Sequence, residues 1–418
     1  MPDSPPIDAG STAWMLTSSA LVLLMVPGLA LFYGGMVRRK NVLSTMMHSF
    51  LAMAVIGVQW IVVGYALAFG ASQAGLIGWD PALLGLHGLE HTRLLADKGV
   101  PELVFVMFQG KFAIITPALI SGALAERVNL RGYLVFIGVW VTFVYCPLAH
   151  WVWAADGWLF KYGVLDFAGG TVVHISAGVS ALVLARMVGP RRDYTAAGGA
   201  AILPNNLTMT LTGAGLLWFG WFGFNAGSAV AVEAPVAGTV AGLAFATTQS
   251  AAAAAALTWM IVERWRHGKA TSVGMASGIV AGLVAITPAA GHVAPWAALV
   301  IGALAALVCF AAVQHKARFG ADDALDAFGV HGVGGLLGAL LVGVFCFTPV
   351  PGLIHGSGAQ LVKQLVGVAV AVAFAAVSTW LIAWVIQRTI GLRATDRQER
   401  DGLDLTVHGE RGYHLEQA

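Results

Sequence analysis

Two histidines occupy matching places in the two halves of the 418-residue sequence. His174 and His331 each follow an aspartate by eight residues, with phenylalanine and glycine in between. Both stand in long apolar stretches, where an ionisable side chain is costly and usually faces a functional interior. The chemistry open to such a pair is hydrogen bonding to a polar solute, or axial ligation of a haem, for which the sequence offers no further signal.

A structural interpretation of the same residues stays open beside the functional one. Each imidazole could simply bond a neighbouring backbone carbonyl, although the matched spacing favours a shared role. Asp166, which precedes His174, suits a helix N-cap because its carboxylate accepts hydrogen bonds from free backbone amides. A buried carboxylate at that point would also favour cations. Eight residues turn a helix ~80° beyond two full turns, so Asp166 and His174 need not face one cavity.

The composition indicates which solvent surrounds the elements that carry these residues. Hydrophobic residues make up 58% of the chain and charged residues 11%, against about 25% charged in a soluble domain. Lipid is therefore the expected solvent. The net charge of +2 gives no electrostatic basis for nucleic-acid binding, and the three cysteines sit in apolar runs without disulfide or metal spacing. The 52 glycines suggest a tightly packed helical bundle.

Eleven apolar stretches are long enough to cross a bilayer as helices, at about 20 residues each. Long apolar runs exclude an outer-membrane barrel, whose strands alternate over short segments. The predicted fold is therefore an all-α integral membrane protein with spans near 13–35, 42–69, 101–125, 133–153, 167–187, 207–229, 236–262, 272–290, 295–314, 327–348 and 361–387.

Basic residues follow every odd-numbered span up to the ninth, whereas the alternate loops hold few. Because basic loops stay in the cytoplasm, the N-terminus is predicted outside and the tail from 389 inside. Residues 1–12 lack a basic segment, so the first apolar stretch is expected to be a true span. The domain prediction is a transmembrane part, 1–388, and a cytoplasmic regulatory tail, 389–418.

The two aspartate–histidine segments lie five spans apart, so they enter the membrane from opposite faces. This arrangement indicates that helices 1–5 and 6–10 form an inverted repeat around a central site. If each aspartate marks a helix start, each histidine lies ~12 Å inside its own face of a core about 30 Å thick. The remaining gap of about 6 Å would let the two imidazoles meet.

Aromatic side chains stand near the ends of several spans. Trp153 closes the fourth span, and the sixth contains Trp218, Trp221 and Phe224. Ring faces attract cations, and tryptophan does so best. Interfacial tryptophan is also an ordinary membrane anchor, and composition alone favours anchoring for most of the fourteen tryptophans.

Several short segments, taken in order, resemble the ammonium transporter (Amt/Mep/Rh) family. The likeness runs from about residue 13 to 413, and the combination is far more specific than any one motif. The segments are Phe32–Gly35, Phe108–Phe112, Gly122–Arg127, Leu165–His174, Gly220–Ser228, Phe328–Gly332, Glu399–Asp404 and His408–Glu410.

The resemblance implies a homotrimer of eleven-helix protomers, each with its own pore. Trp153, Phe112 and Ser228 would form an outer ammonium site supported by Asp166, and Phe112 would stack with Phe224 as a gate. His174 and His331 would line a narrow apolar pore. The outer tryptophan and serine resemble the Amt branch, and three residues are implied as neighbours of the path: Phe108, Gln109 and Trp221.

The resemblance predicts an ammonium transporter or channel in the plasma membrane, the inner membrane of a bacterium. Ammonium differs from potassium in donating hydrogen bonds and in being able to lose a proton. An apolar constriction rejects a bare ion because its desolvation is expensive, so deprotonation before the pore would give selectivity. Lys111, beside the gate, is expected to point away and reach outward.

Other functions are weighed against transport. An ammonium sensor that signals through a cytoplasmic partner is the alternative, disfavoured because no signalling domain follows the short tail. An enzyme is not expected, since no nucleophile–base pair or cofactor motif is present, and neither a metal nor another cofactor is predicted. The resemblance implies an ordered tail that docks on the cytoplasmic face and couples protomers, with a P-II signalling protein as a candidate partner.

Overall fold

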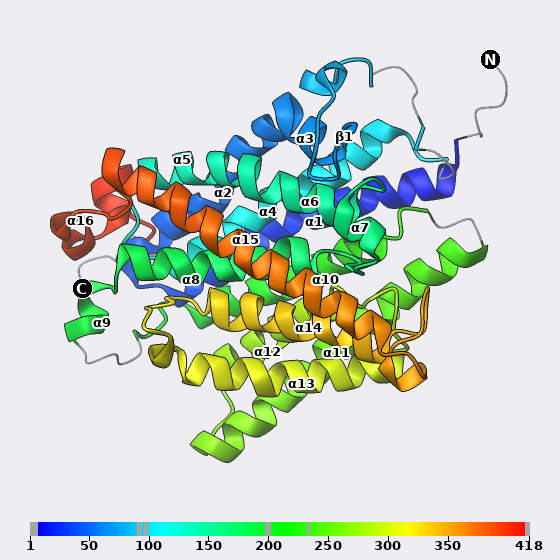
Figure 1. Ribbon diagram of the computed structural model, residues 1–418. Coiled ribbons are helices and arrows are strands. Elements are labelled where there is room, and N and C mark those ends of the chain that lie inside the picture. The colour runs from blue at the N-terminus through cyan, green and yellow to red at the C-terminus, as the bar shows by residue number, and fades with distance from the viewer. Residues whose placement is uncertain (1–6, 90–93, 96–98, 197–201, 232–234, 414–418) are drawn as a thin grey trace.

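The computed structural model is a bundle of long helices that lie side by side, with short connections at both ends (Figure 1). It describes residues 7–89, 94–95, 99–196, 202–231 and 235–413. The long elements in chain order are α1 (Ala9–Met36), α2 (Val42–Gln59) with η2 (Trp60–Gly64) and α3 (Tyr65–Phe69), α4 (Glu102–Leu124), α5 (Leu130–Trp140) with η4 (Val141–Tyr145) and α6 (Cys146–Trp153), η5 (Gly170–Ile175) with α8 (Ser176–Val188), α10 (Leu207–Gly227), α11 (Pro235–His267), α12 (Ser272–Ile286), α13 (Pro295–Gln314), η7 (Phe328–Gly332) with α14 (Val333–Phe345), and α15 (Ala359–Thr389).

Short elements connect the long helices, and two more follow the last of them. Residues 72–78 form a small antiparallel hairpin that pairs Ser72 with Gly78. The short elements are η1 (Arg39–Asn41), β1 (Ser72–Gln73), β2 (Ile77–Gly78), η3 (Pro81–Leu86), α7 (Trp158–Tyr162), α9 (Arg192–Ala196), η6 (Lys316–Phe319), η8 (Leu353–His355), α16 (Asp396–Asp401) and η9 (Asp404–His408).

The predicted spans match the helices closely, and the all-α membrane fold is confirmed. Among the described residues, ten helical segments are long and apolar enough to cross a membrane. The predicted span 272–290 corresponds to α12, which has 15 residues and gives way to turns after Ile286. Most of α12 is buried, and non-helical backbone at membrane depth is tolerated where protein surrounds it. The count of eleven full spans stays a prediction.

The two halves of the bundle meet backbone to backbone beside the histidines. Gly178 and Gly335 each follow a histidine by four residues, about one helical turn. A Cβ atom built on Gly178 would lie 2.2 Å from the amide nitrogen of Gly332, and one on Gly335 would lie 3.0 Å from the Cβ of His174. Each histidine helix therefore uses its glycine to press against the other, as the predicted inverted repeat requires.

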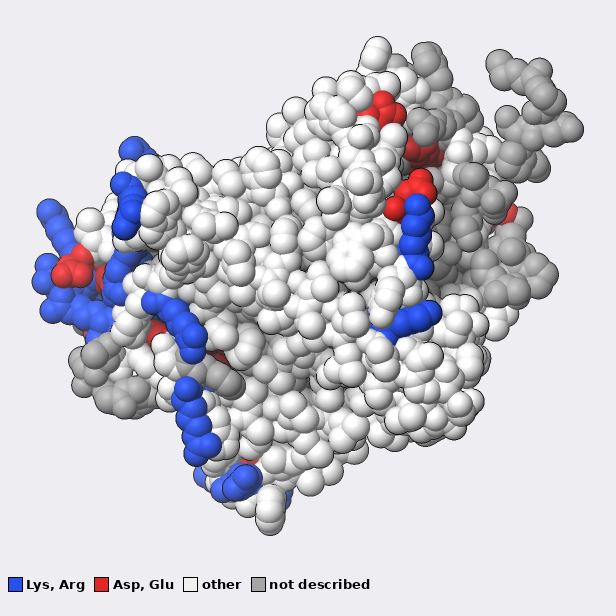
Figure 2. All heavy atoms as spheres, in the orientation of Figure 1, with Lys and Arg blue, Asp and Glu red and all other residues white. Residues whose placement is uncertain are grey.

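The two ends of the bundle differ in charge. Lysine and arginine side chains gather at the end that carries α16 and the start of α5, and they are sparse along the middle (Figure 2). We call this the basic end; it includes Arg38–Lys40, Arg191 and Arg192. Its existence agrees with the alternation of basic loops, while the side of the membrane that it faces stays a prediction.

A buried ion network ties the loops of the basic end together. Glu126 is fully buried, with its carboxylate 2.9 Å from Nε of Arg38 and 3.0 Å from Nη1 of Arg191. Arg191 also binds the carboxylate of Asp322 at 2.8 Å. Burial opposes ionisation of Glu126, but the hydrogen bond and charge of Arg38, with the charge of Arg191, hold its pKa below the ordinary value.

Residues 390–413 pack against the basic end. The Glu399 carboxylate binds Nη2 of Arg393 at 2.7 Å and the backbone amide of Arg192 at 2.5 Å. Asp404 accepts hydrogen bonds from the amides of Leu43 and Ser44, at 3.1 and 2.8 Å, in the first turn of α2. A capping side chain for α2 thus comes from the far end of the sequence.

The glycine contact between the halves makes a prediction about stability. Gly178→Ala would force a methyl group against the backbone of Gly332, and overpacking of a tight interior typically costs about 1–3 kcal/mol. We expect a lower melting temperature in detergent, measured by scanning fluorimetry. Gly215→Ala is the matched control, because a Cβ atom there meets nothing within 4 Å and alanine favours a helix by ~1 kcal/mol. Equal melting of the two variants would contradict the close contact.

Candidate functional site

Two helices begin inside the bundle, and a carboxylate holds each beginning. Asp166 is 6% exposed and accepts hydrogen bonds from the amides of Gly169, Thr171 and Val172 at 2.9–3.1 Å. Free amides at a helix start need such acceptors where water is absent. Burial raises the pKa of Asp166 to about 6, although the amide hydrogen bonds oppose the rise. These contacts are those of a helix cap, the structural role that the sequence offered for Asp166.

Asp323 repeats this arrangement in the second half. Its carboxylate accepts hydrogen bonds from the amides of Ala327, Phe328 and Gly329 at 2.8–3.2 Å. Burial, together with the charge of nearby Asp326, raises its pKa to about 6. The sequence pointed to Asp323 only as part of the repeat, and its contacts make it the structural counterpart of Asp166.

The assumption that each aspartate marks a helix start is wrong. The helix after Asp166 begins four residues later, at Gly170, and the one after Asp323 begins with η7 at Phe328. In both halves the carboxylate reaches back across a bend to the amides of the first turn. Each histidine therefore lies within the first turns of a helix that starts inside the protein.

Both histidines occupy π-helical turns. His174 lies in η5 and His331 in η7, and an α-helix follows each of these turns directly. A π turn widens the helix locally and is common at functional sites. The matching irregularity in the two halves turns both imidazoles toward the same point between them.

The imidazoles of His174 and His331 stack with ring centroids 5.3 Å apart and an interplanar angle of 16°. They are 1% and 3% exposed. Among the described residues, neither ring nitrogen of His174 nor Nδ1 of His331 has a hydrogen-bond partner. The alternative in which each imidazole bonds a neighbouring carbonyl is therefore wrong for His174. Buried polar atoms without a protein partner are uncommon and call for an explanation, such as a polar ligand.

The indole of Trp221 also lies against the ring of His174. The two rings stack at 5.4 Å with an interplanar angle of 19°. The indole nitrogen of Trp221 donates a hydrogen bond to Oγ1 of Thr287 at 2.8 Å. Thr287 follows α12 in the turn that shortens the helix, so the irregular backbone there positions the anchor. Nothing in the sequence singled out Thr287, because an isolated threonine in an apolar segment carries no pattern.

Two phenylalanines lie next to this histidine pair. The rings of Phe112 on α4 and Phe224 on α10 stack at 4.2 Å and 25°, and the Phe224 ring is 6.1 Å from that of His174. Phe108, one turn before Phe112, packs edge-on against it at 4.9 Å. All three phenylalanines are buried. The stacked phenylalanines therefore lie next to the histidine pair, with Phe224 beside His174.

Trp153 and Ser228 lie beyond the phenylalanine pair, partly exposed. The Trp153 ring meets Phe112 edge-on at 5.9 Å, and its indole nitrogen donates to the carbonyl oxygen of Asp166 at 2.9 Å. The Ser228 hydroxyl donates to the carbonyl oxygen of Phe224 at 2.8 Å. Asp166 thus positions Trp153 through its backbone, while its side chain caps the histidine helix.

Two other residues near Phe112 are less constrained. Gln109 is half-buried, and its Oε1 atom has no hydrogen-bond partner within the described parts of the chain. Lys111 is half-buried as well, and its outward orientation stays a prediction. The three cysteines are buried and free. Across the described residues, no cluster of three or more histidine, cysteine or acidic side chains could hold a metal ion.

The comparisons with known proteins agree on one family. The Ammonium Transporter Family profile matches residues 13–413. The ammonium transporter of Bacillus subtilis is 47% identical over 410 residues, which cover 97% of this chain and 98% of that protein. Ammonium transporter Amt1 of Archaeoglobus fulgidus is 43% identical over 407 residues, covering 97% and 99%.

Solved structures share the fold. The crystal structure of Saccharomyces cerevisiae Mep2 superimposes with a TM-score of 0.85 at 37% identity, covering 94% of this chain and 88% of that one. A structure titled "Sensor Amt Protein" gives 0.87 at 30% identity, covering 94% and 97%. The fold is that of a multi-pass membrane transporter. The chain belongs to the ammonium transporter family.

The Asp166 cap makes a prediction that separates its hydrogen bonds from its charge. Asp166→Ala leaves three buried amides without an acceptor, which should cost about 2–4 kcal/mol of stability. Asp166→Asn keeps one acceptor oxygen and should lose less. Thermal melting in detergent measures both. Asp80→Ala, which removes the cap of the exposed helix η3, is the control and should cost under about 1 kcal/mol. Parent-like melting of Asp166→Ala would refute the role.

Proposed function

We propose that the protein transports ammonium by binding it at an outer aromatic site, deprotonating it and conducting ammonia past the paired histidines. The observation that carries this proposal is the stacked His174–His331 pair, buried beneath stacked Phe112 and Phe224 with ring nitrogens that no described residue satisfies. Membership of the family supports ammonium as the substrate.

Recruitment is assigned to Trp153, Phe112 and Ser228. The faces of the two rings attract a cation, and a desolvated contact of this kind is worth about 2 kcal/mol or more. The Ser228 hydroxyl donates its hydrogen bond to the carbonyl oxygen of Phe224. Its oxygen lone pairs therefore remain available to accept a hydrogen bond from ammonium. The carboxylate of Asp166 favours positive charge at this mouth when it is ionised.

Selectivity is assigned to the apolar passage beneath the gate. An ion that leaves water for such a passage loses hydration energy that apolar walls do not replace. Phe112 and Phe224 bar the way to hydrated ions, whereas neutral ammonia needs little space and little solvation. The unpartnered nitrogens of His174 and His331 supply a hydrogen-bond donor and acceptor in this buried passage. Potassium, which has no proton to lose, is excluded.

The cellular setting forms part of the same proposal. The protein resides in the plasma membrane, the inner membrane if the cell is bacterial, with its N-terminus outside and residues 389–418 in the cytoplasm. It assembles as a homotrimer. The docked tail couples neighbouring protomers and is a candidate binding site for a P-II signalling protein. The hydrogen bonds of Glu399 to the amide of Arg192, and of Asp404 to the first turn of α2, support docking of the tail.

A second candidate function is sensing of ammonium without net transport. The similar structure titled "Sensor Amt Protein" favours its consideration. In a sensor the outer site would bind ammonium and the basic end would transmit the signal. Uptake into proteoliposomes distinguishes the two functions, because a pure sensor binds ammonium but accumulates none across a sealed membrane.

Uptake of methylammonium into proteoliposomes tests the outer site. Trp153→Leu should raise the concentration for half-maximal uptake by a few-fold to some tens-fold, since a cation–π contact is worth about 0.5–2 kcal/mol and 1.4 kcal/mol is a decade. The maximal rate should persist. Trp380→Leu, an exposed tryptophan on α15, should leave both values unchanged. A Trp153→Leu protein that is inactive at every concentration would refute recruitment as its role.

Replacing both histidines with acids tests the passage. In the double variant His174→Glu and His331→Glu, two carboxylates would stabilise a cation where the parent offers only neutral imidazoles. We expect potassium flux at least tenfold above the parent, measured by potassium-driven liposome potentials. The exposed pair His267→Glu and His355→Glu is the control. If the buried double variant still excludes potassium and takes up ammonium normally, the histidines do not line the path.

A further inference from the structure

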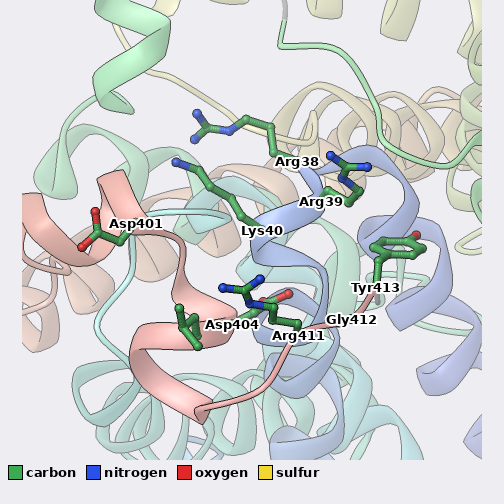
Figure 3. A pocket seen from close by; sticks show the side chains of 9 residues that line it. Arg38, Arg39, Lys40, Asp401, Asp404, Arg411, Gly412 and Tyr413 are labelled. Atoms are coloured by element: carbon green, nitrogen blue, oxygen red, sulfur yellow. The ribbon is translucent and has the colours of Figure 1, made fainter. Parts of the chain in front are cut away.

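A pocket of about 450 Å³ opens at the basic end, away from the paired histidines. Three of its residues come from the connection between α1 and α2, and six come from the tail. Figure 3 shows the labelled side chains around an open centre, with Arg38, Arg39 and Lys40 on one side and Asp404 and Arg411 on the other. The lining residues are Arg38, Arg39, Lys40, Asp401, Asp404, Leu405, Arg411, Gly412 and Tyr413.

The carboxylates of this pocket are already committed. Asp404 is 2% exposed and accepts the amides of Leu43 and Ser44. Asp401 pairs with Nε of Arg397 at 3.5 Å. The pocket therefore holds four cations against two carboxylates, and both carboxylates already have partners of their own.

Two of the four cations remain unsatisfied. Arg38 is engaged by Glu126 and Asp193, and the Lys40 ammonium donates to the carbonyl oxygens of Glu399 and Arg400 at 3.2 and 2.5 Å. Within the described part of the chain, the exposed guanidinium groups of Arg39 and Arg411 have neither an ion-pair partner nor a hydrogen bond. The pocket thus carries excess positive charge on two side chains that are free to bind.

The walls of the pocket are fixed in place. The hydroxyl of Tyr413 donates to Oδ1 of Asn205 at 2.7 Å, which holds the end of the tail against the segment before α10. The amide of Leu403 donates to Oδ1 of Asn41 at 2.9 Å, which holds the tail against the start of α2. A ligand would therefore meet preformed walls, and only the side chains of Arg39 and Arg411 would have to become ordered.

We infer that this pocket binds a phosphate-type oxyanion, with Arg39 and Arg411 as its ligands from the two sides. Arginine pairs with phosphate through two parallel N–H donors, and such charge-assisted bonds are stronger than neutral ones. The volume is ample for a phosphate group. This inference does not depend on the proposed transport mechanism, because none of the lining residues belongs to the aromatic site or the histidine pair.

The ligand would stabilise the docked tail. Six of the nine lining residues belong to residues 401–413, so the pocket is complete only when the tail is in place. A ligand that binds only the docked state shifts the docking equilibrium toward it, and docking strengthens ligand binding by the same factor. The same phosphate chemistry has two sources at a membrane surface: inorganic phosphate or a soluble phosphate ester, and the headgroup of an anionic phospholipid.

Hydrogen exchange of residues 396–413 in the full-length protein tests the inference and separates the sources. In phosphatidylcholine nanodiscs, inorganic phosphate should slow exchange of the tail in a saturable manner, and added potassium chloride should weaken the effect by screening. In nanodiscs that contain 30% phosphatidylglycerol, slow exchange without added phosphate would identify the lipid headgroup as the ligand. Unchanged exchange in both arms would overturn the inference.

Charge-removing variants locate the ligand. Arg39→Gln and Arg411→Gln should each weaken the protective effect about tenfold in ligand concentration, and the double variant should abolish it. The matched control is Arg264→Gln with Lys269→Gln, an exposed cation in the last turn of α11 and another just after the helix, and it should retain full protection. If Arg39→Gln speeds exchange of the tail in phosphatidylcholine nanodiscs without added inorganic phosphate, the charge of Arg39 stabilises the docked tail by itself and the inference fails. It also fails if the double variant is protected like the parent.

Discussion

The structure depends on two helices that begin in the buried interior of the bundle. Backbone amides at a helix start need acceptors, and in an apolar bundle only the protein can supply them. Asp166 and Asp323 each accept three amides, and this allows η5 and η7 to start inside the bundle. The imidazoles of His174 and His331 reach one another because their helices begin there.

The same constraint gives the two ends of the molecule different characters. On the side of Asp166, the surroundings are aromatic and polar, and the indole of Trp153 donates a hydrogen bond to the backbone carbonyl of the aspartate. At the basic end, Glu126, Arg191 and Asp322 form a buried network that joins separate loops. A pair of buried ions is costly unless its geometry is good. Here Glu126 and Arg191 each have two charged partners, and the Asp322 carboxylate accepts three hydrogen bonds from Arg191. One end is thus suited to contact a cation, and the other to hold the fold and the tail.

Much of this architecture could be predicted from the sequence, because hydropathy and the matched aspartate–histidine spacing report directly on membrane burial and symmetry. The spans agreed with the helices within a few residues, apart from the shortened α12. The π turns at His174 and His331, and the late helix starts, could not be foreseen, since both arise from packing between the halves. Thr287 escaped notice for a related reason: its role is defined only by the indole of Trp221 across the bundle. Orientation and assembly involve membrane and partner chains that no single sequence contains.

The cap that Asp404 provides for α2 has a consequence for biosynthesis. Leu43 and Asp404 are 361 positions apart, so the first turn of α2 enters the bilayer long before its cap has been translated. The helix must insert while those amides donate to water or lipid headgroups. They can donate to the Asp404 carboxylate only when the chain is nearly complete. Closure of the basic end is therefore a late, high-contact-order event. A chain that stops before residue 404 would contain both histidine helices but would leave the first turn of α2 without its cap.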